Sequence, residues 1–301
     1  MAAATANIAK EKNRAYINTG AGTPDLTGPQ CNPQTIHWSY DTYMLARSTA
    51  GATVKNGGDT WYFITANYVF GQQLQRDATA FVVKGGGKVL GAALYPFPET
   101  TDFSSFLVQA QSSGAKVVGL SNAGADTVNS VKQAHEFGLT SGGAKLAALL
   151  ATIQVVDSLT LEVAQGLLLT ESFYWDLNDR TRAFTKRLEK RTDGKPANME
   201  QAGCYGGTTH YLKAVKALGL EKAREGAAVI AQMKATPTDD DAFGKCSIRE
   251  DGRFLCPAYL FEVKKPSESK GRWDYYNLVA TTSAEDAAPP LAEEHCPMVK
   301  G

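Results

Sequence analysis

Apolar residues recur in two alternating patterns from residue 60 to residue 170. Short apolar runs rich in β-branched and aromatic residues predict strands, and between them apolar residues three and four positions apart mark one face of a helix. The predicted strands are 61–65, 89–94, 116–120, 146–151 and 166–170, and the helices between the first four are 71–84, 103–110 and 126–137. Strands that alternate with helices predict an α/β fold with a parallel sheet covered by helices on both faces.

The rest of the chain follows other patterns. Residues 179–218 are helical, with a basic face on Thr181–Arg191 and apolar residues at core spacing in Tyr205–Leu218. Strands return at 246–248, 253–263 and 273–280, with a hairpin turn at Asp251-Gly252. Asn13–Gly20 predicts a strand, with 36–39 as a candidate neighbour, but too little chain precedes it to build a sheet. We therefore expect missing N-terminal sequence, an incomplete first part of the fold, and exposed apolar faces on helices 181–191 and 205–218.

Composition and charge narrow the classes of function. Hydrophobic residues make up 43% of the chain, which excludes wholesale disorder. Thirty-one basic residues balance thirty-one acidic ones, which gives no reason to expect nucleic acid as a partner. The longest aliphatic run, Leu146–Ile153, is shorter than the ~18 residues of a membrane-spanning helix. Lys10, Lys12 and Arg14 follow the apolar start instead of preceding it, so we expect neither membrane insertion nor a signal peptide in this sequence.

Motifs for metals, cofactors and catalysis fail on spacing. Gly138–Gly143 is similar to a phosphate loop, but Ala144 separates it from Lys145, and Gly85–Gly91 precedes a strand where a dinucleotide motif would follow one. The cysteines are too far apart for a metal knuckle, and an odd, sparse set is more typical of buried apolar residues than of disulfides; they are Cys31, Cys204, Cys246, Cys256 and Cys296. The histidines lack partners at ligand spacing; they are His37, His135, His210 and His295. We expect no metal, no cofactor and a binding protein, not an enzyme.

Five motifs in a fixed order carry a family resemblance. They are Asn18-Thr-Gly-Ala-Gly-Thr-Pro-Asp-Leu-Thr27, Trp61–Ile64 leading into Asn67-Tyr-Val-Phe-Gly71, Thr101-Asp-Phe-Ser104, Asn122-Ala-Gly-Ala-Asp126, and Lys132-Gln-Ala134. From Ala15 to about Leu278, the chain resembles the periplasmic substrate-binding proteins of ABC importers, in the branch typified by the leucine/isoleucine/valine-binding protein.

The resemblance implies a two-lobed fold of the type I periplasmic-binding-protein class, with three crossings and a ligand captured between the lobes. It assigns residues 1–42 to a remnant of lobe 1, 43–175 to lobe 2, 176–256 to a return to lobe 1, and 257–301 to a final crossing, a hairpin on lobe 2 and a tail. The implied function is an extracytoplasmic, periplasmic solute receptor that delivers a small carboxylate to a membrane permease. The alternative is a ligand-sensing module of a receptor or regulator with the same fold.

The resemblance also implies which residues contact the ligand. In lobe 1, backbone N–H groups of the turn Gly20, Ala21, Gly22 and Thr23 would hold a carboxylate, because glycine lets an anion approach the backbone closely. In lobe 2, Tyr68 or Phe70 would lie over the cleft, and Asn122 and Ala123 would contact the ligand from the end of a strand. Trp38 and Tyr174, at the crossings, would suit a flat ring. At each position the alternative is an ordinary turn or core packing.

One departure from the family concerns the kind of ligand. Amino-acid binders of this family carry an acid after the strand that matches 146–151, but Leu149-Leu-Ala-Thr-Ile-Gln154 has none. A buried ammonium without a partner is costly, so an aromatic or aliphatic acid without an amine is a better candidate than an α-amino acid. Asp157 is the one nearby acid that could restore an amino-acid ligand.

Overall fold

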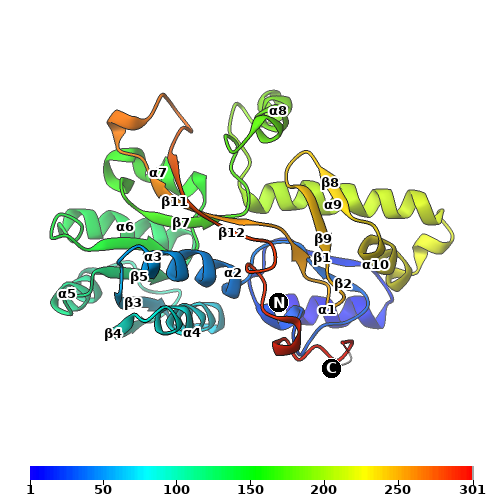
Figure 1. The fold of residues 1–301 in the computed structure, drawn as a ribbon, viewed down its shortest axis with the longest axis horizontal. Coiled ribbons are helices and arrows are strands. Elements are labelled where there is room, and N and C mark those ends of the chain that lie inside the picture. Colours follow the sequence, from blue (N-terminus) through cyan, green and yellow to red (C-terminus); the bar gives the residue numbers. More distant parts are fainter. Residues whose placement is uncertain (300–301) are drawn as a thin grey trace. The chain divides into compact units, whose positions relative to one another are not determined.

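The computed structural model describes residues 1–299 and divides the chain into two units (Figure 1). The first unit contains Met1–Asp41, Ser172–Pro257 and the segment from Ser283 onward. The second unit contains Thr42–Glu171 and Ala258–Thr282. The chain therefore passes between the units four times, and the passage after Thr282 adds one to the three crossings that the resemblance implies.

The second unit is built around a seven-stranded sheet with the order β12-β11-β7-β6-β5-β3-β4. Its strands are β3 (Thr60–Ala66), β4 (Lys88–Tyr95), β5 (Val117–Ser121), β6 (Lys145–Ala148), β7 (Leu168–Glu171), β11 (Ala258–Val263) and β12 (Tyr276–Thr282). Strands β3 to β7 are parallel, whereas β11 and β12 each run antiparallel to their neighbours. Phe63, Ile64 and Val118 are completely buried because helices cover both faces, and this confirms the predicted α/β fold.

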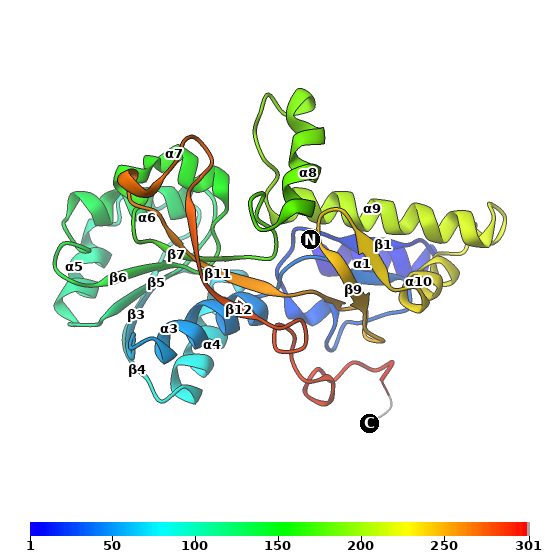
Figure 2. The same cartoon turned by 45° about the horizontal axis from the view of Figure 1, so that its top comes forward.

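Helices lie on the two faces of this sheet (Figures 1 and 2). They are α2 (Thr42–Ala46), the π-helical turn η2 (Arg47–Gly51), α3 (Ala52–Lys55), α4 (Val69–Lys84), α5 (Ser104–Ser112), α6 (Ala125–Glu136) and α7 (Ile153–Ala164), with a 3₁₀ turn η5 (Pro266–Glu268) before β12. Helix α4 packs with α2 and η2 on one face, and α6 packs against α5 and α7 on the other. Leu74, Ala78 and Phe81 are among the buried residues of α4, and their helical spacing is the pattern that predicts this helix.

The first unit combines a short parallel sheet with an antiparallel one. Strands β1 (Tyr16–Asn18) and β2 (Thr35–His37) are parallel, and β8 (Thr238–Asp240), β9 (Gly244–Ile248) and β10 (Phe254–Leu255) form the order β10-β9-β8. The helices are α1 (Ala2–Glu11), α8 (Asp179–Leu188), α9 (Met199–Leu218) and α10 (Gly226–Ala235), with 3₁₀ turns η1 (Pro24–Leu26), η3 (Glu189–Arg191), η4 (Lys222–Arg224) and η6 (Leu291–Glu293). Asp251-Gly252 forms the predicted turn between β9 and β10, with Gly252 at φ +92°.

Helix α9 packs closely on the core of this unit. Trp38 is 1% exposed and belongs to a buried cluster with Ile36, Val229 and Phe254. The helix reaches this cluster because it presents glycines: a Cβ at Gly207 would lie 3.0 Å from Ile17 Cγ2. Helix 205–218 thus has a packing surface on Trp38, which Gly206, Gly207 and Ala214 reach, whereas its apolar residue Leu212 is 58% exposed.

The expectation that the cysteines are unpaired apolar residues is wrong. Cys31 is bonded to Cys296 and Cys246 to Cys256, with Cα–Cα distances of 5.6 and 5.3 Å, while Cys204 is free and exposed. Strand register explains the second pair: Ile248 lies opposite Phe254, and the same register two residues further puts Cys246 opposite Cys256. The two cysteines also stand symmetrically about the predicted turn at Asp251, which is a signal in the sequence.

Candidate functional site

The sheet of the second unit changes its winding direction at β3. The chain runs from β3 to β4 on one side and then crosses back past β3 to β5 on the other, so the change of direction lies between β3 and β5. In open parallel sheets, ligands bind at such a point, in the crevice beyond the carboxyl ends of the strands. Tyr68 follows β3, and Asn122 and Ala123 follow β5. The topology therefore brings these three predicted residues to adjacent strand ends.

An aromatic pair lies at the ends of β3 and β4. The ring of Tyr68 stacks on that of Phe97 with centroids 4.4 Å apart and an angle of 18°, and Phe70 is 6.0 Å from Tyr68. Phe97 is 40% exposed, and burial raises the pKa of Tyr68, so its hydroxyl keeps its proton. The pair offers an apolar surface with a polar tip. Sequence reasoning missed Phe97, although an aromatic residue between two prolines just after a strand is a usable signal.

The side chain of Asn122 is turned into the protein. It is completely buried, donates from Nδ2 to Ser130 Oγ (3.0 Å) and accepts at Oδ1 from the Thr127 hydroxyl (2.9 Å). It therefore fixes the beginning of α6. Gly124 caps the beginning of α6 at φ +61°. The polar groups that Ala123 and Gly124 can present to a ligand at this strand end are therefore those of the backbone.

Hydrogen bonds hold the predicted loop of the first unit, Gly20–Thr23. Asn18 closes the turn, because its Oδ1 accepts from Ala21 N (3.1 Å) and its Nδ2 donates to Ala21 O (2.7 Å). Gly20 is exposed, and no atom lies within 4 Å of a Cβ built there, so an anion has room to approach. Gly22 is buried, and the Thr23 hydroxyl accepts from Asp25 N (3.3 Å) as the cap of η1. Both glycines thus stay within one ordered turn.

Tyr40, three residues after the end of β2, supports this loop. Its hydroxyl donates to Gly20 O at 2.8 Å and lies 3.0 Å from Glu200 Oε1, at the start of α9. The carbonyl of Tyr40 accepts from His37 Nε2 at 2.9 Å. Burial and the nearby Arg253 lower the pKa of His37 to about 3, so the imidazole is neutral with its proton on Nε2. Sequence analysis did not single out Tyr40.

Two further predicted residues lie in the interior. Trp38 stacks on Phe254 at 4.1 Å and 13° in the core of the first unit. Tyr174 is 5% exposed, with its ring 5.9 Å from that of Trp175. Both rings are thus largely covered, and a direct contact of either with a ligand stays a prediction.

Two acids near the carboxyl end of the second unit's sheet already have partners. Asp126, in the first turn of α6, accepts from the Tyr95 hydroxyl at 2.7 Å. Asp157, on α7, lies 2.9 Å from Arg272 Nη2 and accepts from the Tyr275 hydroxyl at 2.6 Å. Among the described residues, no group of three or more His, Cys, Asp or Glu is arranged to hold a metal ion.

A cavity of about 200 Å³ lies at the opposite edge of this sheet. Its lining includes Lys116, Lys145 and Leu168, which stand at or next to the amino ends of β5, β6 and β7. Because ligands in such sheets bind beyond the carboxyl ends, we place the candidate site at Tyr68, Phe97 and Ala123 and not at this cavity.

Comparisons with known proteins agree with this geometry. The family model described as periplasmic binding protein matches residues 1–272. A periplasmic binding protein from Burkholderia mallei is 46% identical, with a TM-score of 0.92 over 99% of this chain and 78% of that one. A branched chain amino acid ABC transporter periplasmic ligand-binding protein from Burkholderia xenovorans is 36% identical, with a TM-score of 0.89 over the same shares.

A more distant structure shares the fold alone. It is an ABC transporter solute binding protein from R. palustris in complex with benzoate, 21% identical, with a TM-score of 0.81 over 96% of this chain and 75% of that one. None of the helices in residues 1–299 is long and apolar enough to cross a membrane.

Proposed function

Because the chain belongs to the periplasmic binding protein family, we propose that it is the solute receptor of an ABC importer for a small carboxylate and delivers this ligand to a membrane permease. Members of this family bind solutes outside the cytoplasm and are not enzymes. The two disulfides support the same location, since disulfides persist in oxidising compartments.

The proposed ligand is an acid with a flat apolar body, aromatic in the first instance. The observation that carries this choice is the Tyr68–Phe97 stack at the point where the sheet changes its winding direction. A ring placed against this pair gains apolar contact, and the Tyr68 hydroxyl can hydrogen-bond a polar substituent on the ring. The benzoate bound by the R. palustris protein is an acid of this kind.

The carboxylate is proposed to bind backbone N–H groups of the loop Gly20–Thr23 in the first unit, other than that of Ala21, which donates to Asn18 Oδ1. Gly20 has open space on its Cβ side, and Asn18 and Tyr40 hold the turn in one conformation. Preorganised N–H groups bind an anion without paying for loop ordering at the moment of binding. The beginning of α6 at Gly124 gives the second unit its own set of N–H groups.

Branched-chain amino acids are the competing ligand class, as the printed description of the B. xenovorans protein suggests for that protein. An α-ammonium needs an acid, and Asp126 and Asp157 are engaged by Tyr95 and by Arg272 and Tyr275. An ammonium at Asp157 would have to compete with the Arg272 guanidinium, so Asp126 is the acid that it would use, and an ammonium without such a partner would cost several kcal/mol. An acid without an amine needs no such partner.

A thermal-shift panel tests the ligand class. Benzoate, 4-hydroxybenzoate, leucine and the neutral isostere benzamide are compared, because a ligand at 100 times its Kd adds about 2.7 kcal/mol of stability. Stabilisation by an acid and not by benzamide or leucine supports the proposal. Stabilisation by leucine alone would replace it with an amino-acid receptor, and no shift with any acid would overturn it.

Substitutions locate the site. Phe97→Ala removes one ring of the stack and should weaken binding of the aromatic acid, whereas Phe137→Ala serves as the matched control. Phe137 is an aromatic residue of similar exposure (44% against 40%) that ends α6 at the opposite edge of the sheet. Equal effects of the two variants would show that the stack is not the ligand surface.

A further inference from the structure

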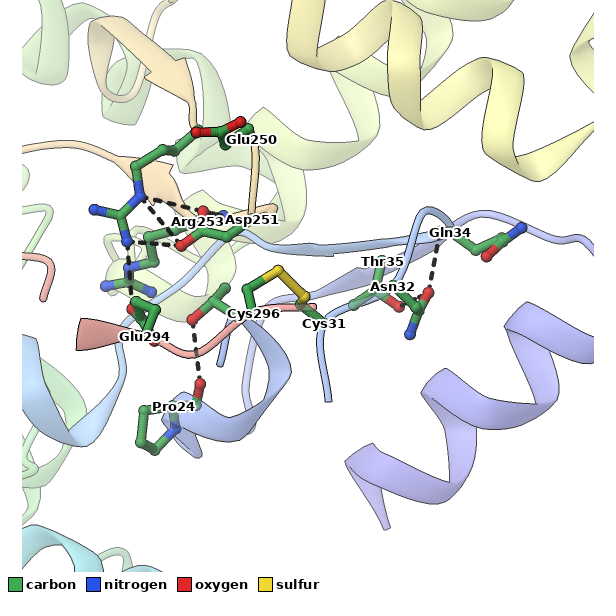
Figure 3. Close-up of a disulfide and its surroundings, with 12 residues drawn as sticks. Pro24, Cys31, Asn32, Gln34, Thr35, Glu250, Asp251, Arg253, Glu294 and Cys296 are labelled. Carbon is green, nitrogen blue, oxygen red and sulfur yellow. Dashed lines mark hydrogen bonds and ion pairs between the residues drawn. A yellow bond between two sulfur atoms is a disulfide. The ribbon is translucent and has the colours of Figure 1, made fainter. Parts of the chain in front are cut away.

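The segment after Ser283 returns to the first unit and is fastened there at several points. It contains η6 and reaches Cys296, which is bonded to Cys31 (Figure 3). Cys31 and Cys296 are 5% and 4% exposed, so the bond is an interior one. We call residues 289–296 the C-terminal brace. The brace is thus tied to the stretch of chain that follows the loop Gly20–Thr23.

Arg249, on the turn after β9, provides the second fastening. Its Nη1 donates to Pro289 O at 2.7 Å, and its Nη2 lies 3.3 Å from Glu294 Oε1. The same guanidinium is held by both carboxylate oxygens of Asp251, at 2.7 to 3.2 Å. Glu294 and Asp251 are buried, so these bonds are shielded from water and the brace is held at both of its ends.

The third contact is a close approach of two backbones. A Cβ at Gly28 would lie 2.9 Å from Glu294 O, which is nearer than real Cβ atoms approach. Gly28 and Thr27 both donate their N–H to Pro24 O at 3.1 Å, and Pro24 directly follows Thr23. The brace therefore contacts the chain within a few residues of the end of the loop.

We propose that the C-terminal brace positions the ligand loop Gly20–Thr23 from its downstream end; this rests on the proposed function, in which that loop binds the carboxylate. Asn18 and Tyr40 hold the upstream end and the middle of the loop. Downstream, η1 spans only Pro24–Leu26, and residues 28–31 are tied to the brace by Gly28 and Cys31. A loop held at both ends keeps its N–H groups in one arrangement before the ligand binds.

The other disulfide gives a matched control. Cys246–Cys256 lies in the same unit and clips the β9–β10 hairpin, which carries Arg249, so its removal loosens at most one of the three fastenings of the brace and leaves Cys31–Cys296 and the Gly28 contact in place. Cys31→Ser with Cys296→Ser releases the brace, and Cys246→Ser with Cys256→Ser removes a bond of the same kind elsewhere. Gly28→Ala is a second test, because it pushes the chain away from Glu294 while both disulfides stay intact.

The experiment is hydrogen exchange of the full chain without ligand, followed by benzoate titration. Releasing the brace should speed exchange in residues 18–28 and raise the Kd on the order of tenfold, with Gly28→Ala acting in the same direction. The control should speed exchange mainly around the hairpin, and less in residues 18–28 than release of the brace does, because it affects only the Arg249 fastening. Unchanged exchange in residues 18–28 in the released variant, or an equal rise in the control, would overturn the proposal. Because exchange is read without ligand, a wild-type chain that binds no acid would refute the proposed function while leaving this test of the brace intact.

Discussion

Glu294 gives the structure a measurable dependence on pH. Its side chain is 4% exposed and sits near two other buried acids, Asp41 and Asp251, with Arg249 and Arg253 as the cations. Burial, followed by repulsion from the two acids, raises the pKa of Glu294 from 4.5 to about 7. Glu294→Gln replaces the carboxyl with a neutral group of the same shape that can still accept from Arg249.

The size and sign of the effect follow from proton linkage. Between pH 4.5 and about 7 the folded chain holds this proton and the unfolded chain has released it, so the free energy of unfolding falls as pH rises. A shift from 4.5 to about 7 corresponds to roughly 3 kcal/mol, lost in full above pH 7. Glu294→Gln has no such loss. We expect it to match the wild type at pH 4.5 and to exceed it at pH 8 by up to about 3 kcal/mol.

Urea unfolding of both proteins at pH 4.5, 6 and 8 measures this difference. The two proteins are compared at each pH because His37, with its lowered pKa of about 3, adds an opposite slope between pH 3 and 6.5 that is common to both. A difference between the two proteins that stays constant from pH 4.5 to pH 8 would refute the assignment of a raised pKa to Glu294.

Three further changes test the first unit. Tyr40→Phe removes the hydrogen bond to Gly20 O, worth about 1 kcal/mol, and should weaken benzoate binding about fivefold in a titration while the melting temperature changes little. Gly207→Val forces a branched side chain against the core and should lower the free energy of unfolding by about 1–3 kcal/mol. Thr208→Ala, at the exposed neighbouring position, should change it by less than about 0.5 kcal/mol. Equal changes in the two variants would contradict the packing described for α9. Cys204 is a free thiol whose Sγ lies 3.2 Å from Thr19 Oγ1, next to the loop Gly20–Thr23. It should react with one equivalent of maleimide under non-reducing conditions, and more slowly when benzoate is present. Labelling at the same rate with saturating benzoate would argue against a ligand beside this loop.

The sequence predicted the second unit well because its strands are buried on both faces. Runs such as Trp61–Thr65 and Lys116–Leu120 are almost wholly apolar, and the helices between them carry clear apolar faces. The predicted carboxyl ends of these strands therefore lie close to the observed ones. Tyr68 and Ala123, which follow two of these ends, were located correctly along the chain for the same reason. Phe97 was missed because its stacking partner, Tyr68, is 29 residues away in the sequence.

The first unit was harder to predict because distant segments build it. The packing of Trp38 against three glycines of α9 and against Phe254 could not be read from the sequence, because these residues lie more than 160 positions further along the chain. The pairing of Cys31 with Cys296 spans 265 residues and depends on the return of the chain after Ser283, which no local pattern indicates. Asn122 was placed at the correct strand end, but its side-chain direction follows from Ser130 and Thr127, one to two turns into α6.

Isothermal titration of the full chain with benzoate, and in parallel with leucine, tests the central claim most directly. We expect saturable binding of benzoate with one ligand per chain and no heat of binding from leucine, because the proposed ligand groups are backbone N–H groups and an aromatic stack, and Asp157 is already paired with Arg272. Binding of leucine with no binding of benzoate would contradict the claim that this receptor takes a carboxylate without an amine.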